Sequence, residues 1–194
     1  MQPMSKSEST KYRLADAMKA CMKSTPVDKI TVRQLVEACS TTRQTFYRHF
    51  KDKFDLINWY FDKVLLQSFS HMGEGRTVYE GLCRKFDYIK EERVFFTGAF
   101  RYDEQNSLKQ HDFELILQFY TDRIIAKTGQ PPSEDIQFAL ELYCYGSIYM
   151  TVKWVLSGMK ASPCEMARAL EEAMPAKLYE LFLALRLIEE RGEE

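Results

Sequence analysis

The sequence predicts an all-α protein in which an N-terminal helix-turn-helix domain of three helices precedes a C-terminal helical bundle. Apolar residues recur at helical spacing from residue 14 to residue 188. No segment shows the alternation of polar and apolar residues that is typical of strands. The 194 residues contain 45% apolar side chains, enough for one large or two small domains.

Helix-capping residues indicate where the first three helices begin. Capping boxes at Ser5–Glu8 and Thr31–Gln34 open the first and second helices. The third helix follows the stretch CSTT, with Thr42 as its N-cap. Phe46 and Phe50 are four residues apart and therefore share the buried face of this third helix.

A longer helix over residues 52–71 is expected to connect the two domains, which we place at 1–53 and 72–194. An apolar stripe that begins at Phe54 runs along this helix. The stretch MGEGR, residues 72–76, contains two glycines and marks the linker. We expect the connecting helix to act as a lever between the domains.

The C-terminal domain is expected to end in three helices. The longest covers about residues 134–158 and is apolar nearly all round, so it should be buried on several sides. Shorter helices at 163–174 and 176–190 follow, and Pro163 at a first helical position is a strong start signal.

The last two predicted helices each carry an apolar stripe that a second subunit could cover. Two such helices from each subunit would form a four-helix interface in a symmetric homodimer. Packing on their own subunit is the alternative. The expected interface residues are Met166, Leu170, Leu178, Leu181, Phe182 and Leu185.

Charge is distributed unevenly along the chain. Residues 1–53 carry eleven Lys and Arg but only five Asp and Glu, a net charge of +6, whereas residues 54–194 carry −7. A basic segment on an acidic body indicates that the first quarter of the chain meets a polyanion.

The stretch TTRQTFYRHFKDK, residues 41–53, places basic and aromatic side chains on the third helix. With Phe46 buried, two outward pairs remain, Arg43 with Tyr47 and Gln44 with Arg48. In a helix-turn-helix the second helix of the motif enters the major groove, where Arg pairs with guanine and Gln with adenine. A merely solvated helix face and a protein-interaction module are the competing interpretations.

Residues around the same helix are suited to phosphate contacts. Tyr47, His49, Lys51 and Lys53 are placed for the DNA backbone. The helix that starts near Asp52 adds free N-terminal amides, which attract anions.

This region resembles the DNA-binding region of TetR/AcrR-type regulators, over about residues 8–65. The family pattern T-x-Y-x-H-F-x-x-K is carried by Thr45, Tyr47, His49, Phe50 and Lys53. The resemblance implies a homodimer that binds a pseudo-palindromic double-stranded DNA operator and senses a ligand or partner through a variable helical domain. It also implies that Arg43, Gln44 and Thr45 face bases, while Thr31, Thr42, Tyr47, His49 and Lys53 hold the DNA backbone.

One position departs from the family pattern. Ser40 stands where the family usually has glycine, which suits a positive φ in the turn. Serine there implies either backbone strain or a turn of another shape.

The stretch YIKEERVFFTGAFRYDEQNSLKQH, residues 88–111, carries a looser resemblance to a subgroup from low-GC Gram-positive bacteria, which includes the activator of dihydroxyacetone-kinase genes. That activator responds to a partner protein. Two functions are therefore expected for this chain: a repressor that a small-molecule ligand releases from its operator, or an activator that a partner protein controls. In both, the effector shifts the population toward another spacing of the two DNA-reading heads.

Aromatic side chains of the C-terminal domain could line an effector cavity between helices, although aromatic residues at helical spacing are more often simply core. The candidate ligand-binding residues are Phe96, Phe100, Tyr120, Tyr143, Tyr149 and Trp154.

No catalytic or cofactor motif is recognisable. The histidines, His49, His71 and His111, fall on three different predicted elements, so no metal site is expected. No phosphate-binding glycine loop is present, and we expect no cofactor and no enzyme. The five cysteines form no CxxC pair and predict reduced thiols in a cytoplasmic protein. No apolar run predicts a membrane span or a signal peptide.

Overall fold

The computed structural model describes residues 5–69, 78–101 and 108–188. Within these ranges the regular structure is helical and no strand occurs, which confirms the predicted all-α fold. His71 and the glycines of MGEGR lie outside the described residues.

The chain forms two compact units. The first comprises Met1–Val64 and Glu92–Leu108, and the second comprises Leu65–Glu91 and Lys109–Glu194. The division therefore falls inside the connecting helix. The first unit also includes a helix from the segment that we expected to belong entirely to the C-terminal domain.

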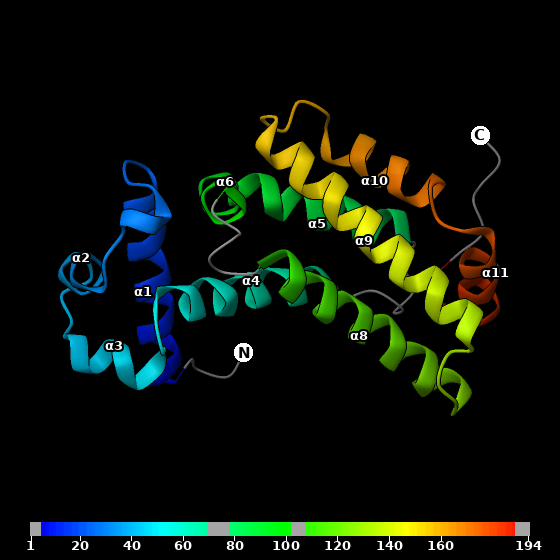
Figure 1. Ribbon diagram of the computed structural model, residues 1–194, viewed down its shortest axis with the longest axis horizontal. Coiled ribbons are helices and arrows are strands. Elements are labelled where there is room, and N and C mark those ends of the chain that lie inside the picture. Colours follow the sequence, from blue (N-terminus) through cyan, green and yellow to red (C-terminus); the bar gives the residue numbers. More distant parts are fainter. Residues whose placement is uncertain (1–4, 70–77, 102–107, 189–194) are drawn as a thin grey trace. The chain divides into compact units, whose positions relative to one another are not determined.

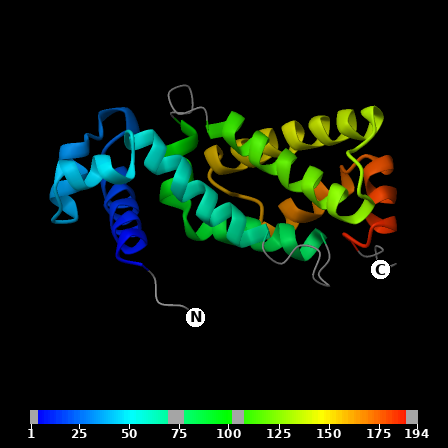
Figure 2. The ribbon, with the colours of Figure 1, turned by 90° about the horizontal axis from the view of Figure 1, so that it is seen from below.

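The first unit contains the predicted helix-turn-helix. Its elements are α1 (Lys6–Met22), the 3-10 turn η1 (Val27–Lys29), α2 (Val32–Ala38), α3 (Arg43–His49), the first part of α4 (Lys53–Phe69) and α6 (Arg93–Arg101). Figures 1 and 2 show α2 and α3 packed beside α1. The predicted N-caps are present, because Ser5, Thr31 and Thr42 each accept a hydrogen bond from the backbone three residues later.

An aromatic core holds the first unit together. Phe46 of α3 is fully buried, as the predicted anchor of that helix. On α6, Phe95 packs edge-on against Tyr60 with ring centroids 4.8 Å apart, and Phe96 packs against Phe61 at 5.8 Å. These contacts explain why α6 groups with α1 and α4.

Gly98 allows α6 to approach the end of α1 closely. A Cβ atom at this position would lie 3.2 Å from the sulfur of Met22. A larger residue at position 98 would therefore require the Met22 side chain to move by a few tenths of an ångström.

The second unit is a bundle. Its helices are α5 (Val78–Glu91), α8 (Leu108–Thr128), α9 (Glu134–Leu156), α10 (Pro163–Glu172) and α11 (Ala176–Ala184). The predicted start at Pro163 is confirmed, with a complete capping box between Ser162 and Glu165. The final helix ends at Ala184, earlier than the predicted residue 190, and Arg186 just beyond it has a φ of 54°.

Buried aromatic side chains of the second unit find partners within that unit. The hydroxyl of Tyr143 donates to the carbonyl of Leu170 at 3.0 Å, and the indole N–H of Trp154 donates to the carbonyl of Ala161 at 2.9 Å. Tyr120 stacks on Phe182 with centroids 5.3 Å apart. The polar tips of Tyr143 and Trp154 are thus satisfied by the protein itself.

Candidate nucleic-acid interface

Helix α3 has an exposed face of polar and positively charged side chains, and its opposite face is anchored by a buried aromatic side chain. Arg43, Gln44, Tyr47 and Arg48 are exposed, and the Tyr47 side chain keeps 51% of its accessible surface although its ring edge contacts Phe46. Gln44, Tyr47 and Arg48 also line one hollow of the surface. The structure therefore brings these four predicted DNA-binding residues together on one side of α3.

Hydroxyl groups at the start of α3 are engaged within the helix. Thr42 Oγ1 accepts from the Thr45 amide at 3.1 Å and lies 3.0 Å from the Thr45 hydroxyl. Arg48 donates to that Thr45 hydroxyl at 3.2 Å. These bonds position the threonines and one arginine before any DNA is bound.

Thr31 has the same role at the start of α2. Its hydroxyl accepts from the Gln34 amide at 3.3 Å, and its own amide donates to the Gln34 side chain at 2.8 Å. The predicted phosphate contact of Thr31 would have to share this capping oxygen.

His49 lies half-buried at the end of α3. Burial lowers its pKa, and the nearby charges of Arg48 and Lys11 lower it further. The imidazole is therefore mainly neutral at pH 7, and it can contact phosphate as an N–H donor but adds little positive charge.

Lys53 differs from the sequence-based expectation. Its ammonium donates to the carbonyls of Val27, Asp28 and Ile30 at 2.7, 2.8 and 2.9 Å. A lysine has three donors, so all are used to fix the 3-10 turn η1. In this structure Lys53 holds the loop before α2 instead of presenting a free charge to phosphate.

The N-terminus of α4 is also occupied by the protein itself. The carboxylate of Asp52 accepts from the amides of Phe54 and Asp55 at 2.8 and 2.9 Å. An acidic cap already satisfies the amides that we expected to attract a phosphate. The expectation of a free anion site at this helix end is therefore corrected.

Ser40 adopts the backbone conformation that favours glycine. Its φ is 51°, and the amide of Thr41 donates to the carbonyl of Val36 at 2.8 Å, which is the hydrogen bond of a Schellman turn. The turn between α2 and α3 keeps its glycine-type geometry, so the strain alternative holds and α3 is not displaced by a turn of another shape.

The predicted ligand-binding residues are divided between the two compact units. Phe96 and Phe100 belong to the core of the first unit, whereas Tyr120, Tyr143 and Trp154 are buried in the second. The remaining one, Tyr149, is 68% exposed on α9. Their role in ligand binding stays a prediction.

The residues predicted for the subunit interface are largely used within the subunit. Leu170, Leu178 and Phe182 are buried in this single chain, while Met166, Leu181 and Leu185 are partly exposed. The alternative of packing on their own subunit therefore holds for the buried three.

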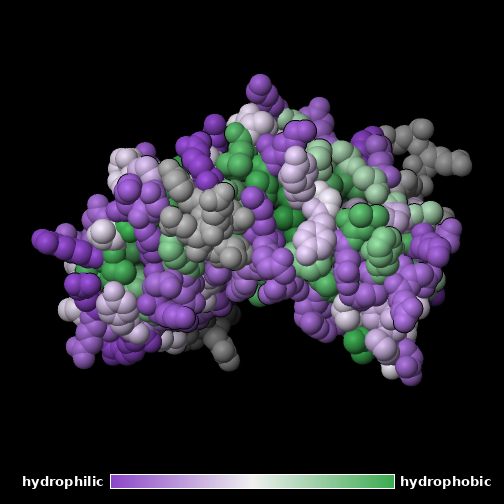
Figure 3. Space-filling view, in the orientation of Figure 1, coloured by the Kyte–Doolittle hydropathy of each residue, from purple (hydrophilic) through white to green (hydrophobic). Residues whose placement is uncertain are grey.

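Sequence reasoning missed the exposed face of α9. The strongly exposed apolar side chains there are Phe138, Leu142, Tyr145, Tyr149, Met150 and Leu156. The sequence indicates a helix that is apolar nearly all round, but periodicity alone does not distinguish a buried face from an open one. Apolar and pale residues interrupt the hydrophilic surface over this helix (Figure 3).

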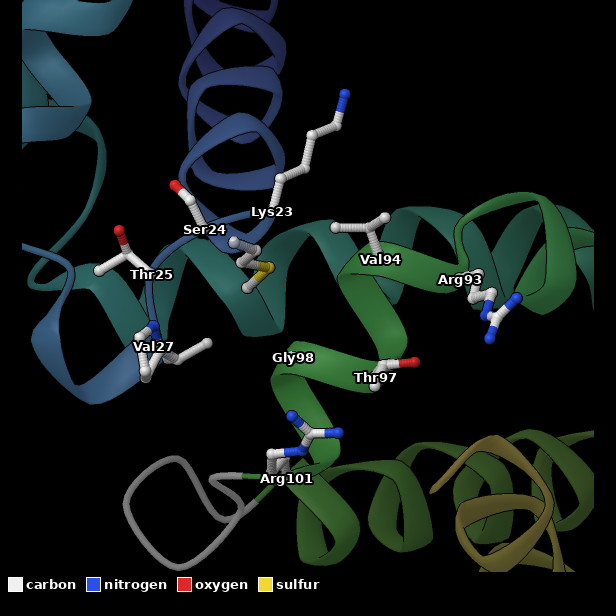
Figure 4. A pocket seen from close by; sticks show the side chains of 11 residues that line it. Lys23, Ser24, Thr25, Val27, Arg93, Val94, Thr97, Gly98 and Arg101 are labelled. Carbon is white, nitrogen blue, oxygen red and sulfur yellow. The ribbon is translucent and has the colours of Figure 1, made fainter. Parts of the chain in front are cut away.

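A second feature missed from the sequence is a pocket of about 410 Å³ between the end of α1 and α6 in the first unit. Figure 4 shows Lys23, Arg93 and Arg101 around it, with Thr97 and Gly98 between them. None of the three cations forms an ion pair with a described residue. The α1–α6 contact that frames the pocket joins segments about seventy residues apart, beyond the range of sequence periodicity.

Other chemistry finds no support in the part of the chain that the structure describes. It contains no group of three or more His, Cys, Asp or Glu that could hold a metal ion. No described helix is long and apolar enough to cross a membrane.

Comparisons with known proteins agree with this geometry. A family model for bacterial regulatory proteins of the tetR family matches residues 14–59, and a model for a transcriptional regulator C-terminal region, TetR_C_8, matches residues 76–175. A relative from Lactococcus lactis subsp. lactis (strain IL1403), the HTH-type dhaKLM operon transcriptional activator DhaS, is 26% identical over 122 residues. The match covers 63% of this chain and 64% of the relative, less than two thirds of its length.

A solved structure described as the dihydroxyacetone kinase operon activator DhaS shares the fold. It covers 93% of this chain and 98% of its own, with a TM-score of 0.58 and 17% identity. The matches of both domains to TetR models and the exposed, basic α3 lead to one conclusion. The chain belongs to the TetR family of bacterial transcriptional regulators, which bind DNA and are not enzymes.

Proposed function

We propose that this regulator binds a pseudo-palindromic operator as a homodimer and reads it with α3. The observation that carries the proposal is the exposed face of α3, where Arg43 and Gln44 occupy the first turn. Side chains in that turn reach base edges when a recognition helix lies in the major groove. Tyr47 and Arg48, one turn later, are placed for the phosphates on either side.

A dimer needs a surface that two copies can share, and α9 supplies one. From residue 136 to residue 152, every exposed residue of α9 is apolar, Tyr or Gly. Phe138 and Tyr149 keep 69% and 68% of their accessible surface. Soluble monomers rarely leave such a contiguous apolar stripe in water.

The middle of this stripe is suited to a two-fold axis. Gly146 is exposed, and a Cβ atom there would meet nothing within 4 Å. Because a two-fold axis brings a residue against its own copy, glycine at the centre lets two α9 helices cross closely. Leu142 and Tyr149 then lie on the two sides of the crossing. We therefore assign the main subunit interface to α9, with the partly exposed Leu181 and Leu185 of α11 as candidates for its margin.

Substitutions on α9 test the dimer and its link to DNA binding. Leu142→Asp should give a monomer in sedimentation at micromolar concentration and lower operator affinity at least tenfold, because one recognition helix no longer positions the other. Glu134→Gln, at an exposed polar position of the same helix, is the control. A Leu142→Asp variant that still sediments as a dimer would contradict the assignment.

The direction of regulation is proposed from two observations. The relative from Lactococcus is named an activator. The polar groups of Tyr143 and Trp154, which we had considered as ligand contacts, are bonded to Leu170 and Ala161 of the same chain. The first observation favours an activator over a repressor. The second favours control by a partner protein over release by a small molecule.

A reporter experiment distinguishes activation from repression. The operator is first defined by selecting binding sites from random DNA. A promoter carrying that operator is then compared in cells with and without the gene for this chain. An activator raises transcription when the gene is present, whereas a repressor lowers it. Arg43→Ala supplies the control that separates operator binding from indirect effects.

A further inference from the structure

Two cysteines far apart in the sequence meet in the second unit. The sulfur of Cys83 on α5 lies 3.3 Å from the sulfur of Cys164 on α10, and 81 residues separate them. Helices α5 and α10 pack side by side (Figure 1). Cys164 is exposed and Cys83 is half-buried. An oxidant from solution can therefore reach the Cys164 thiol directly, and the Cys83 thiol lies next to it.

The surroundings of the pair contain polar groups from both helices. The Tyr79 hydroxyl interacts with the sulfurs of Cys83 and Cys164 and with Arg168, and the guanidinium of Arg168 lies 5.7 Å from the centre of the Tyr79 ring. Cys164 follows Pro163 in the first turn of α10. The negative charge of Asp87 on α5 contributes to raising the pKa of the Cys83 thiol.

The Cys83 thiol is harder to ionise than an ordinary cysteine. Burial, followed by the hydrogen bond with Cys164, raises the pKa of Cys83 to about 11. Cys83 is therefore a weak nucleophile toward a free oxidant. It can still attack an oxidised neighbour with which it is already in contact, because proximity replaces a bimolecular encounter.

The other cysteines do not share this arrangement. Burial raises the pKa of Cys144 to about 12, and Cys144 is closed to solvent. Cys21 and Cys39 are half-buried, and burial raises the pKa of each. Among the described residues, Cys83 and Cys164 are the pair whose sulfurs touch.

We propose that Cys83 and Cys164 form a redox modification site, in which hydrogen peroxide converts the dithiol to an intramolecular disulfide. Peroxide first oxidises the Cys164 thiol to a sulfenic acid and releases one water. The Cys83 sulfur then forms the S–S bond and displaces the hydroxyl group, which leaves with the Cys83 proton as a second water. Two electrons pass from the two thiols to one peroxide. A small dithiol then reduces the disulfide to two thiols and is itself oxidised to a disulfide.

The geometry requires only a small adjustment. A disulfide bond is about 2.05 Å long, so the sulfurs must approach by roughly 1.2 Å, which side-chain rotation and a slight shift of α10 can supply. The crosslink would close a loop of about eighty residues and restrict the unfolded chain strongly, so oxidation should raise the Tm by roughly 5 °C or more.

Thiol counting on the full-length reduced protein tests this site. After a stoichiometric peroxide pulse, the wild type should lose two titratable thiols and 2 Da in mass, and a non-reducing peptide map should join the Cys83 and Cys164 peptides. Dithiothreitol should restore both thiols. Cys39→Ser should behave like the wild type in all of these measurements.

Single substitutions identify the order of events. Cys83→Ser should accumulate a sulfenic acid on Cys164 that dimedone labels, whereas Cys164→Ser should slow peroxide consumption at least tenfold. A wild type that loses no thiols, that forms only disulfides between subunits, or that shows the same dimedone labelling as Cys83→Ser would overturn the proposal.

Discussion

The hydroxyl of Tyr60 donates a hydrogen bond to the carboxylate of Glu92 at 2.9 Å and accepts one from the ammonium of Lys19 at the same distance. Tyr60 lies on α4, Glu92 directly precedes α6, and Lys19 belongs to α1. Burial opposes the charge of Lys19, but hydrogen bonds with Tyr60 and Asp16 outweigh burial and raise the lysine pKa. One polar network thus joins α1, α4 and the start of α6 in the first unit.

Removing the Tyr60 hydroxyl should weaken this unit without emptying its core. We expect Tyr60→Phe to lower the free energy of unfolding by about 1.5–3 kcal/mol, because the hydroxyl bonds to two charged groups. Urea unfolding measures the change. Tyr12→Phe is a matched control, because the Tyr12 hydroxyl forms no hydrogen bond with a described residue.

Arg43 should contribute to sequence discrimination. We expect Arg43→Ala to cost about 1–3 kcal/mol on the best operator and to relax the preference at one base pair, as loss of a bidentate base contact does. Arg33→Ala, on the exposed face of α2, removes an equal charge and should affect all sequences alike. If both variants weakened specific and non-specific binding equally, Arg43 would not read a base.

Lys53 should matter for stability more than for DNA charge. Lys53→Met leaves three carbonyl groups without their charged donor, and we expect a loss of about 1.5–3 kcal/mol in the free energy of unfolding. Lys51→Met, two residues earlier and exposed, should be nearly neutral. A salt titration adds a second test. A lost phosphate contact would lower the slope of log K against log salt by about 0.9, so we expect Lys53→Met to leave this slope unchanged.

Ser40 should be a site where glycine is more stable. Ser40→Gly removes the steric cost of a φ of 51°, and we expect a gain of about 0.5–1 kcal/mol in stability. The same substitution at Ser24, which has no positive φ, should instead be destabilising. Thermal unfolding of the two variants gives opposite shifts in Tm if the backbone conformation is the cause.

The ion pair between Asp135 and Lys177 predicts a local pH dependence. Their side chains are 2.8 Å apart, and hydrogen bonds from Lys177 and Ser133 lower the pKa of Asp135 to about 2. Because the folded-state pKa is depressed, the stabilisation is present above about pH 3.8 and disappears as the pH falls toward 2.

Carboxyl chemical shifts measure this effect directly. Lys177→Met should raise the Asp135 pKa part of the way toward its ordinary value, because the Ser133 hydroxyl still donates at 2.6 Å. Lys160→Met, an exposed lysine elsewhere in the second unit, should leave the titration unchanged. An Asp135 pKa that stays near 2 in Lys177→Met would assign the shift to the serine alone.

Local chemistry explains why much of the fold could be predicted from the sequence. The caps at Thr31, Thr42 and Ser162 and the anchor Phe46 depend on residues within four positions of each other. The face of α3 follows from the same spacing. These features need no knowledge of distant parts of the chain.

What could not be predicted depends on long-range contacts. The carbonyls that hold Lys53 come from residues more than twenty positions earlier, and the partner of Cys83 is 81 residues away. The exposure of the apolar face of α9 could not be predicted for a different reason. The same apolar repeat can pack against its own subunit or against another one. Sequence periodicity indicates that a face is apolar but not which surface covers it.

The apolar face of α9 also affects how the regulator responds to its own abundance. If only paired chains engage an operator, then at concentrations below the dimer dissociation constant the active species grows with the square of the chain concentration. A twofold rise in synthesis would then give a fourfold rise in occupancy at a weak promoter. The exposed apolar side chains of α9 would thereby make operator occupancy depend steeply on the concentration of the chain.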